Sequence, residues 1–137
     1  MKKIFFVLAA ALSFPAIVPV NAQNPEPPDI PTIAAKEAER LESLLDLEYW
    51  QVVYVDSTLQ YNYKALQDEI MEMSRSKVSN ASLYQAIQDK WMEKTDSSYM
   101  NIFNETQWKA YLKSGAAKQQ KARAKRKAQA EAKIEKK

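Results

Sequence analysis

Residues 47–76, LEYWQVVYVDSTLQYNYKALQDEIMEMSRS, decide the fold, because their apolar side chains recur at intervals of seven and no proline or glycine interrupts them. Two interleaved series make up the repeat: Val52, Leu59, Leu66 and Met73, and Tyr63 and Ile70. A repeat of about 3.5 residues lets two helices stay in register side by side. The segment therefore predicts a long helix that packs along a second helix.

The segments on either side also carry apolar residues at helical spacing. Over 33–45, the stripe contains Ala34, Ala38, Leu41, Leu44 and Leu45. Over 80–102, it contains Leu83, Ile87, Trp91 and Ile102. With a fourth helix from 105 onward, we expect an all-α fold, an elongated helical hairpin of about four helices in which 47–76 and 80–102 lie antiparallel. Leu66 and Ile87 should then be buried between them.

Capping residues mark the starts of these helices. Asn104 can cap the fourth helix, and Gln107, three residues later, completes a capping box. Phe103 and Trp108 occupy the two positions of a hydrophobic staple around it. The same reasoning places caps for the third and second helices at Ser79 and Asp46.

Charge divides the chain into an acidic body and a basic tail. Residues 23–115 carry a net charge of −6, and residues 116–137 carry +7. Gly115 is expected to end the packed body, so 116–137 should form a basic, largely solvated helix whose removal leaves the body's stability unchanged. Its most crowded basic residues are Lys118, Lys121, Arg123, Lys125, Arg126 and Lys127.

The tail has two interpretations, a binding segment or a solubilising extension. As a binding segment it fits anionic lipid or lipopolysaccharide, or the acidic body of another copy. No nucleic acid is expected as a partner, because the tail has no aromatic residue to stack on bases.

The first residues indicate export. Lys2 and Lys3 precede an apolar run from Ile4 to Leu12, and small residues precede a cut after Ala22, as in a secretory signal peptide. A Pro-rich linker follows over 23–32, and a helical domain over 33–115. We expect a periplasmic or secreted protein of a Gram-negative bacterium, with cleavage near Ala22.

Composition argues against an enzyme. The chain has no His, no Cys and one Gly, which removes the commonest metal ligands and general base and any phosphate-binding loop. We expect no catalytic residue, metal or cofactor. Two acidic rows are interpreted as solvated helix faces: Asp68, Glu69 and Glu72, and Asp89, Glu93 and Asp96.

Aromatic residues are abundant for a helical protein. Trp50, Trp91 and Trp108 are expected in the core. Three tyrosines off the apolar stripes are candidates for a client or partner surface: Tyr49, Tyr61 and Tyr99. Asp56-Ser57-Thr58 is similar to an O-glycosylation motif of some Gram-negative anaerobes, so glycosylation of Ser57 or Thr58 stays open.

Two segments resemble the L-T-x-x-Q motif of the Spy/CpxP family of periplasmic stress proteins. The first is Leu47-Glu48-Tyr49-Trp50-Gln51, with Glu in place of Thr, and the second is Phe103-Asn104-Glu105-Thr106-Gln107, with Phe for Leu and Asn for Thr. The resemblance covers about residues 33–115. It implies an ATP-independent chaperone or envelope-stress accessory, a helical hairpin that forms homodimers and binds unfolded proteins. The competing expectation is a structural or adaptor protein of the envelope with one defined partner.

Overall fold

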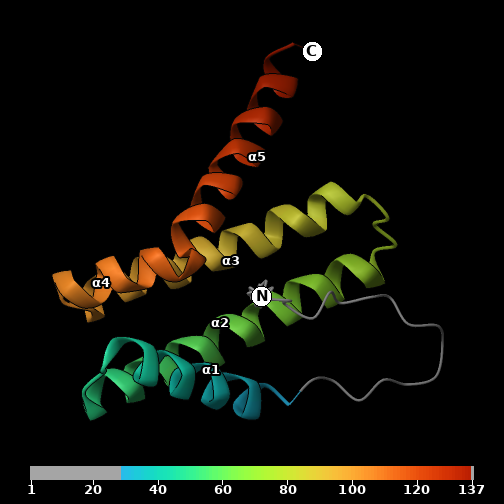
Figure 1. Cartoon of the computed structure of the whole chain (residues 1–137). Helices are drawn as coiled ribbons and strands as arrows, with labels where there is room; N and C mark the ends of the chain where they lie inside the picture. Colours follow the sequence, from blue (N-terminus) through green and yellow to red (C-terminus); the bar gives the residue numbers. More distant parts are fainter. Residues whose placement is uncertain (1–28, 137) are drawn as a thin grey trace, which may run out of the picture.

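The described part of the chain, residues 29–136 of a computed structural model, folds entirely into helices (Figure 1). The expected signal peptide and most of the Pro-rich linker lie outside these residues. The elements are α1 (Ile30–Leu45), α2 (Tyr49–Arg75), α3 (Ala81–Ile102), α4 (Glu105–Tyr111), a π-helical turn η1 (Leu112–Ala116), and α5 (Ala117–Glu135). The predicted all-α hairpin is confirmed. None of these helices is long and apolar enough to cross a bilayer.

Two of the predicted helix starts are wrong by a few residues. α1 begins at Ile30 rather than at 33, because Pro31 lies in its first turn, where the missing N–H has no intrahelical partner to lose. Asp46 does not cap α2. It closes α1 in the left-handed conformation, with φ 52°, and α2 is capped at Glu48, whose backbone N–H donates to Gln51 Oε1 at 2.8 Å.

The turn between α2 and α3 has the predicted position but a different cap. Asn80, not Ser79, precedes α3, and its side chain accepts from the backbone N–H of Ser82 at 2.9 Å. Lys77 takes a positive φ of 55° in this turn. Tyr84 donates from its hydroxyl to the carbonyl oxygen of Val78 at 2.7 Å, which ties α3 to the turn.

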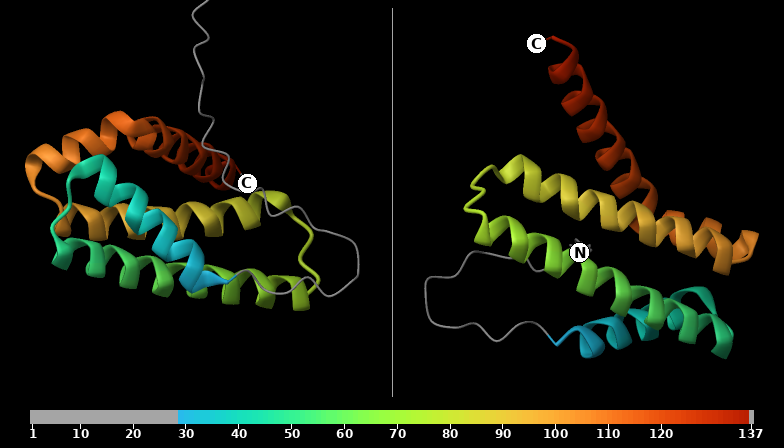
Figure 2. Two further views of the ribbon diagram at one scale, coloured as in Figure 1. Left: turned by 60° about the horizontal axis from the view of Figure 1, so that its bottom comes forward. Right: turned by 180° about the vertical axis from the view of Figure 1, so that it is seen from behind.

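The helices form two layers (Figure 2). α2 and α3 make an antiparallel hairpin, and α1 lies along the half of α2 nearest the α1–α2 turn. α4 reverses from the end of α3 and contacts α1. α1 and α4 therefore cover one face of the hairpin, at the end where α2 begins and α3 ends.

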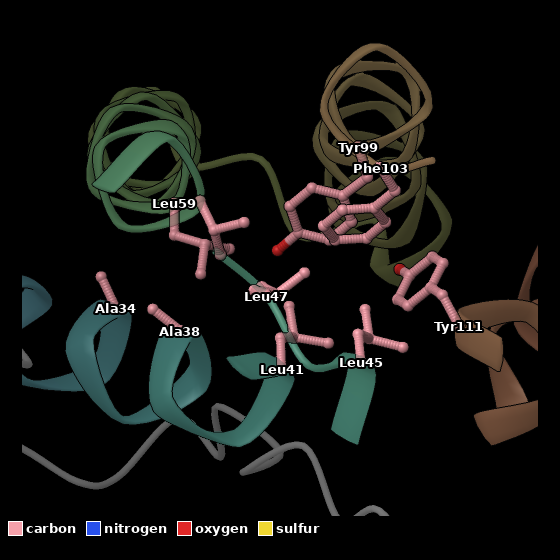
Figure 3. Packing of buried hydrophobic residues seen from close by; sticks show 10 residues of the cluster. Ala34, Ala38, Leu41, Leu45, Leu47, Leu59, Tyr99, Phe103 and Tyr111 are labelled. Atoms are coloured by element: carbon pink, nitrogen blue, oxygen red, sulfur yellow. The ribbon is translucent and has the colours of Figure 1, made fainter. Parts of the chain in front are cut away.

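The core lies at this covered end. Figure 3 shows its members converging from α1, α2, α3 and α4. They are Ala34, Ala38, Leu41, Leu45, Leu47, Val55, Leu59, Tyr99, Phe103 and Tyr111. Towards the α2–α3 turn, Leu66 and Ile87 are only half-buried, because no third helix covers the hairpin there. The prediction that both are fully buried is wrong.

Gly115 has the predicted left-handed conformation, with φ 115°, but it does not end the helical part of the chain. It lies in η1, and the backbone re-enters α-helical geometry as α5 in a new direction (Figure 1). The first half of α5 docks on α3 through Arg123 and Arg126. α5 is largely exposed, as predicted, but these two arginines hold its first half on the body.

Candidate functional site

The two motif segments meet in the structure. Gln51 Nε2 donates to Gln107 Oε1 at 2.7 Å, and Gln107 Nε2 donates back to Gln51 Oε1 at 3.0 Å. Leu47 and Phe103, which open the two segments, are both buried in the core. The sequence-predicted motif residues thus form one junction between the start of α2 and the start of α4.

Each glutamine of the junction is also bonded to the backbone. Gln51 Nε2 reaches the carbonyl of Ile102 at 2.9 Å, and Gln107 Nε2 reaches that of Asp46 at 3.4 Å. Gln107 Oε1 accepts from the backbone N–H of Asn104 at 3.0 Å, and Asn104 Oδ1 accepts from that of Gln107 at 2.9 Å, which completes the predicted capping box. Since these amides are satisfied within the protein, the junction has a structural role.

The face of the α2–α3 hairpin opposite α1 and α4 is uncovered, and it carries an open groove of about 690 Å³. One wall comes from α2 and the other from α3. The lining residues are Ser57, Thr58, Tyr61, Asn62, Lys90, Trp91, Glu93, Lys94, Ser97 and Ser98. We call this the hairpin groove. It is amphipathic, with two aromatic rings among hydroxyl, amide and ammonium groups.

Tyr61 and Trp91 form the aromatic centre of the hairpin groove. Their rings meet edge to face, with centroids 6.3 Å apart, and Tyr61 is 71% exposed while Trp91 is buried. The Lys94 ammonium stands over the Trp91 ring at 4.1 Å from its centroid. The indole N–H of Trp91 donates to Glu69 Oε1 at 3.1 Å. These contacts hold Trp91 in place at the floor of the groove. Tyr61 adds an exposed apolar surface to the groove, and Lys94 adds a positive charge.

A charge pair lies beside this groove. Lys90 Nζ lies 2.6 Å from Glu69 Oε2. The hydrogen bond from Lys90 lowers the pKa of Glu69. The pair is exposed, so it contributes little stability, but it links α2 to α3 beside Trp91.

The aromatic surface continues along α2 beyond the hairpin groove. Trp50, Tyr54 and Ser57 follow one another at i, i+4 and i+7, so they lie on the same side of the helix as Tyr61. Trp50 and Tyr54 are 48% and 60% exposed, and their rings meet edge to face at 6.0 Å. Val53, beside them, is also exposed. We call Trp50, Val53, Tyr54 and Tyr61 the α2 aromatic stripe.

Two expectations about aromatic residues are wrong. Trp50 was expected in the core, but α2 turns Gln51 and Val55 inward, which leaves Trp50 on the outer side. Tyr99 was expected at the surface, but it is 2% exposed, because it stacks on Phe103 at 5.0 Å and meets Tyr111 at 5.3 Å. Burial raises the pKa of Tyr99 well above its usual value.

The other predicted surface and core aromatics are placed as follows. Tyr49 and Tyr61 are exposed, in agreement with their interpretation as surface residues. Trp91 is buried, and Trp108 is half-buried against Tyr111 at 5.5 Å.

A second cavity, of about 380 Å³, lies on the covered face between α1, α3 and α5. The carboxylate at its centre is paired: Asp96 accepts from the Tyr111 hydroxyl at 2.6 Å, from Gln120 at 3.2 Å and from Arg123. Burial raises the pKa of Tyr63, which lines the cavity, to about 12. This cavity is a gap between helices that its own polar side chains hold together.

Three residues of the acidic rows join helices. Glu69 pairs with Lys90, Asp89 with Arg126, and Asp96 with Arg123. The sequence interpretation of solvated faces is therefore wrong for Asp96, which is buried. Within residues 29–136 no group of acidic side chains is arranged to hold a metal ion.

In the possible glycosylation motif, Ser57 is exposed and Thr58 is half-buried.

The tail residues separate into two groups. Arg123 is 5% exposed and Arg126 is half-buried, and each bonds to a carboxylate of α3. The others are exposed: Lys118, Lys121, Lys125 and Lys127. No local sequence signal distinguishes the two groups, because the partners Asp96 and Asp89 lie far back in the chain.

Comparison with known proteins returned no match to this chain, whether among protein-family models, curated proteins or solved structures.

Proposed function

We propose that this protein is an exported, ATP-independent chaperone-like protein of the bacterial envelope that binds unfolded segments of other proteins on the uncovered face of its hairpin. The observation that carries the proposal is the α2 aromatic stripe together with the hairpin groove. Three large aromatic side chains stand exposed in a line, although the same protein buries other aromatics efficiently. Exposed apolar surface of this kind is typical of a contact surface.

The chemistry of the surface suits unfolded chains. Aromatic side chains supply a large contact area at low entropic cost. Lys94 lines the groove beside them and can donate to the carbonyl oxygens of a peptide backbone. The hydroxyls of Ser97 and Ser98 donate to carbonyls of their own helix, so they can accept from the peptide N–H groups. The surface runs along α2 rather than closing around one shape, which favours many partners over one.

Two sequence features support the cellular setting. The N-terminal residues have the pattern of a secretory signal peptide. The resemblance to the Spy/CpxP family rests on the segments that contain Gln51 and Gln107, and these segments form one junction.

The test is suppression of aggregation of several unrelated unfolded proteins, without nucleotide. The wild type should protect several of them, and the variant Trp50→Ser/Tyr54→Ser/Tyr61→Ser should lose most of this protection while keeping its helical circular dichroism. The matched control, Leu44→Ser/Met71→Ser/Met100→Ser, removes three exposed apolar residues that lie outside the α2 aromatic stripe and the hairpin groove and should protect like the wild type. Equal loss in both variants would contradict a defined binding face.

The second candidate function is an envelope adaptor with one defined partner, favoured by the local grouping of Trp91, Lys94 and Tyr61 in one groove. The same assay separates the two. Protection of no unfolded protein by the wild type would overturn the chaperone proposal and leave the adaptor.

A further inference from the structure

Helix α5 presents basic residues on two opposite sides. Gln120, Arg123 and Arg126, spaced by three, all bond to carboxylates of α3 and so define the docked side. Arg126 binds Asp89 with two contacts, Nε to Oδ2 at 2.7 Å and Nη2 to Oδ1 at 2.8 Å. Arg123 and Asp96 are both buried.

The other side of α5 carries lysines. Lys118, Lys121 and Lys125 stand at i, i+3 and i+7, so they share one helix face, roughly opposite to the docked side. All three are exposed, and none forms an ion pair with any residue in the described part of the chain. We call them the lysine face.

The residue types match these two sides. Arginine makes planar, two-pronged contacts with carboxylates, and Arg126 is used in this way, while Arg123 contacts Asp96 through Nη2 alone. Lysine is a compact, strongly hydrated point charge on a flexible stem, suited to a surface of phosphate groups that need not hold a fixed position. Arg123 and Arg126 are neutralised by α3, and the positive charge of the lysine face remains available.

We infer that α5 is an electrostatic arm that binds the lysine face to the anionic phospholipid headgroups of a membrane. The assignment goes beyond the proposed function, which rests on the hairpin groove on the other layer of the molecule. The charge of the arm complements such a surface. The arm belongs to a tail of net charge +7, and phosphate-rich surfaces attract segments of this kind. The lysine face is exposed on the side of α5 away from α3, and α5 stands clear of the hairpin towards its C-terminus (Figure 1), so a flat surface can approach it.

The binding is adsorption without insertion. Ile134 is the only large apolar residue of α5, and it is 74% exposed. An inserted helix needs an apolar face, which α5 lacks. The interaction should therefore be reversible and strongly dependent on salt, because the Debye length falls from about 10 Å at 0.1 M to about 3 Å at 1 M.

The test measures co-sedimentation of the full chain with vesicles of phosphatidylglycerol and phosphatidylcholine, and with vesicles of phosphatidylcholine alone. The variant Lys118→Gln/Lys121→Gln/Lys125→Gln should bind the anionic vesicles on the order of 100-fold more weakly, since each lysine near such a surface contributes on the order of fivefold. The wild type should release the vesicles at 1 M salt.

The control variant Lys36→Gln/Lys77→Gln/Lys113→Gln removes the same charge from three exposed lysines of the body and should bind within about threefold of the wild type. All the proteins share the same N-terminal residues, so differences between them report on α5. Equal weakening of both variants would overturn the assignment, because net charge alone would then explain the binding. So would salt-dependent self-association without vesicle binding, which would make the acidic body of another copy the occupant.

Discussion

The side chains of Gln51 and Gln107, 56 positions apart, each donate a hydrogen bond to the other and each accept one, at 2.7 and 3.0 Å. This reciprocal pair is buried and joins the start of α2 to the start of α4. It holds together the end of the hairpin that carries the core. Because these two bonds are mutual, the loss of either amide removes both of them and leaves the other glutamine with its backbone contacts alone.

The first prediction concerns this pair. Gln107→Met should lower the free energy of unfolding by about 2–3 kcal/mol, because the buried amide of Gln51 and the N–H of Asn104 lose bonding partners. Urea unfolding of Gln107→Met, Gln51→Met and the double variant gives the coupling energy, which should exceed about 0.5 kcal/mol. Additive losses would show that the two amides act independently. Gln85→Met, at an exposed position of α3, should change stability little.

The cap of α4 can be tested separately. Asn104→Ala should cost about 1 kcal/mol, because the N–H of Gln107 loses the Asn104 Oδ1 acceptor at 2.9 Å. Asn104→Ser keeps an acceptor and should recover most of that stability. Thermal melts of the three proteins decide the matter, and an unchanged midpoint for Asn104→Ala would mean that α4 does not depend on this cap.

Shortening the chain should separate the two halves of α5. Deletion of residues 117–137 removes Arg123 and leaves the buried Asp96 without its cation, which should destabilise the body by roughly 3 kcal/mol. Arg123→Met in the full chain should have a similar effect. Deletion of residues 128–137 removes no bond to α3 and should leave the melting temperature unchanged. If both truncated proteins melt like the wild type, the docking of α5 adds nothing to stability.

The two ends of the hairpin should respond differently to a buried charge. Val55→Asp at the covered end should cost at least about 3 kcal/mol, because its side chain is fully buried. Leu66→Asp, at a half-buried position, should cost about 1–2 kcal/mol, because the carboxylate can reach water. Chemical denaturation measures both. Equal losses would indicate that a further surface covers the hairpin near Leu66 in solution.

Alkaline pH should weaken the fold through Tyr63. Burial raises its pKa to about 12, above the value near 10 of an unfolded chain, so the folded state keeps the phenol proton to higher pH. The corresponding stability is fully present below about pH 10 and is lost as the pH rises through about 12. Between pH 10 and 12, the free energy of unfolding of Tyr63→Phe should therefore fall by roughly 1–2 kcal/mol less than that of the wild type. Parallel pH profiles for the two proteins would contradict this assignment.

Local chemistry in the sequence was enough to predict the helices. The heptad spacing from Val52 to Met73 and the capping residue Asn104 depend on neighbours within one or two turns, so they can be recognised without the fold. The hairpin followed from two long helices joined by a short turn. The left-handed conformation of Gly115 could be predicted in the same way, from its own residue type and its place at the end of a helix.

What the sequence did not predict depends on contacts between distant segments. Trp91, Thr95 and Tyr99 follow one another at intervals of four and are all buried on one face of α3. Because Thr95 is polar, the sequence did not show this face as part of the core. Trp50 was expected in the core with the other two tryptophans, but its side of α2 has no helix over it. The pairing of Arg123 with Asp96 joins residues 27 apart, and nothing near either residue announces it.

Gly115 is the only glycine of the chain, and its φ of 115° is one that a residue with a Cβ adopts only at considerable cost. That single torsion angle sets the course of α5 away from α4, and with it the angle between the lysine face and the α2 aromatic stripe. The relative orientation of the two surfaces thus depends on one backbone torsion together with the ion pairs that dock α5 on α3. A substitution of Gly115 would re-aim one surface against the other while leaving the chemistry of both intact.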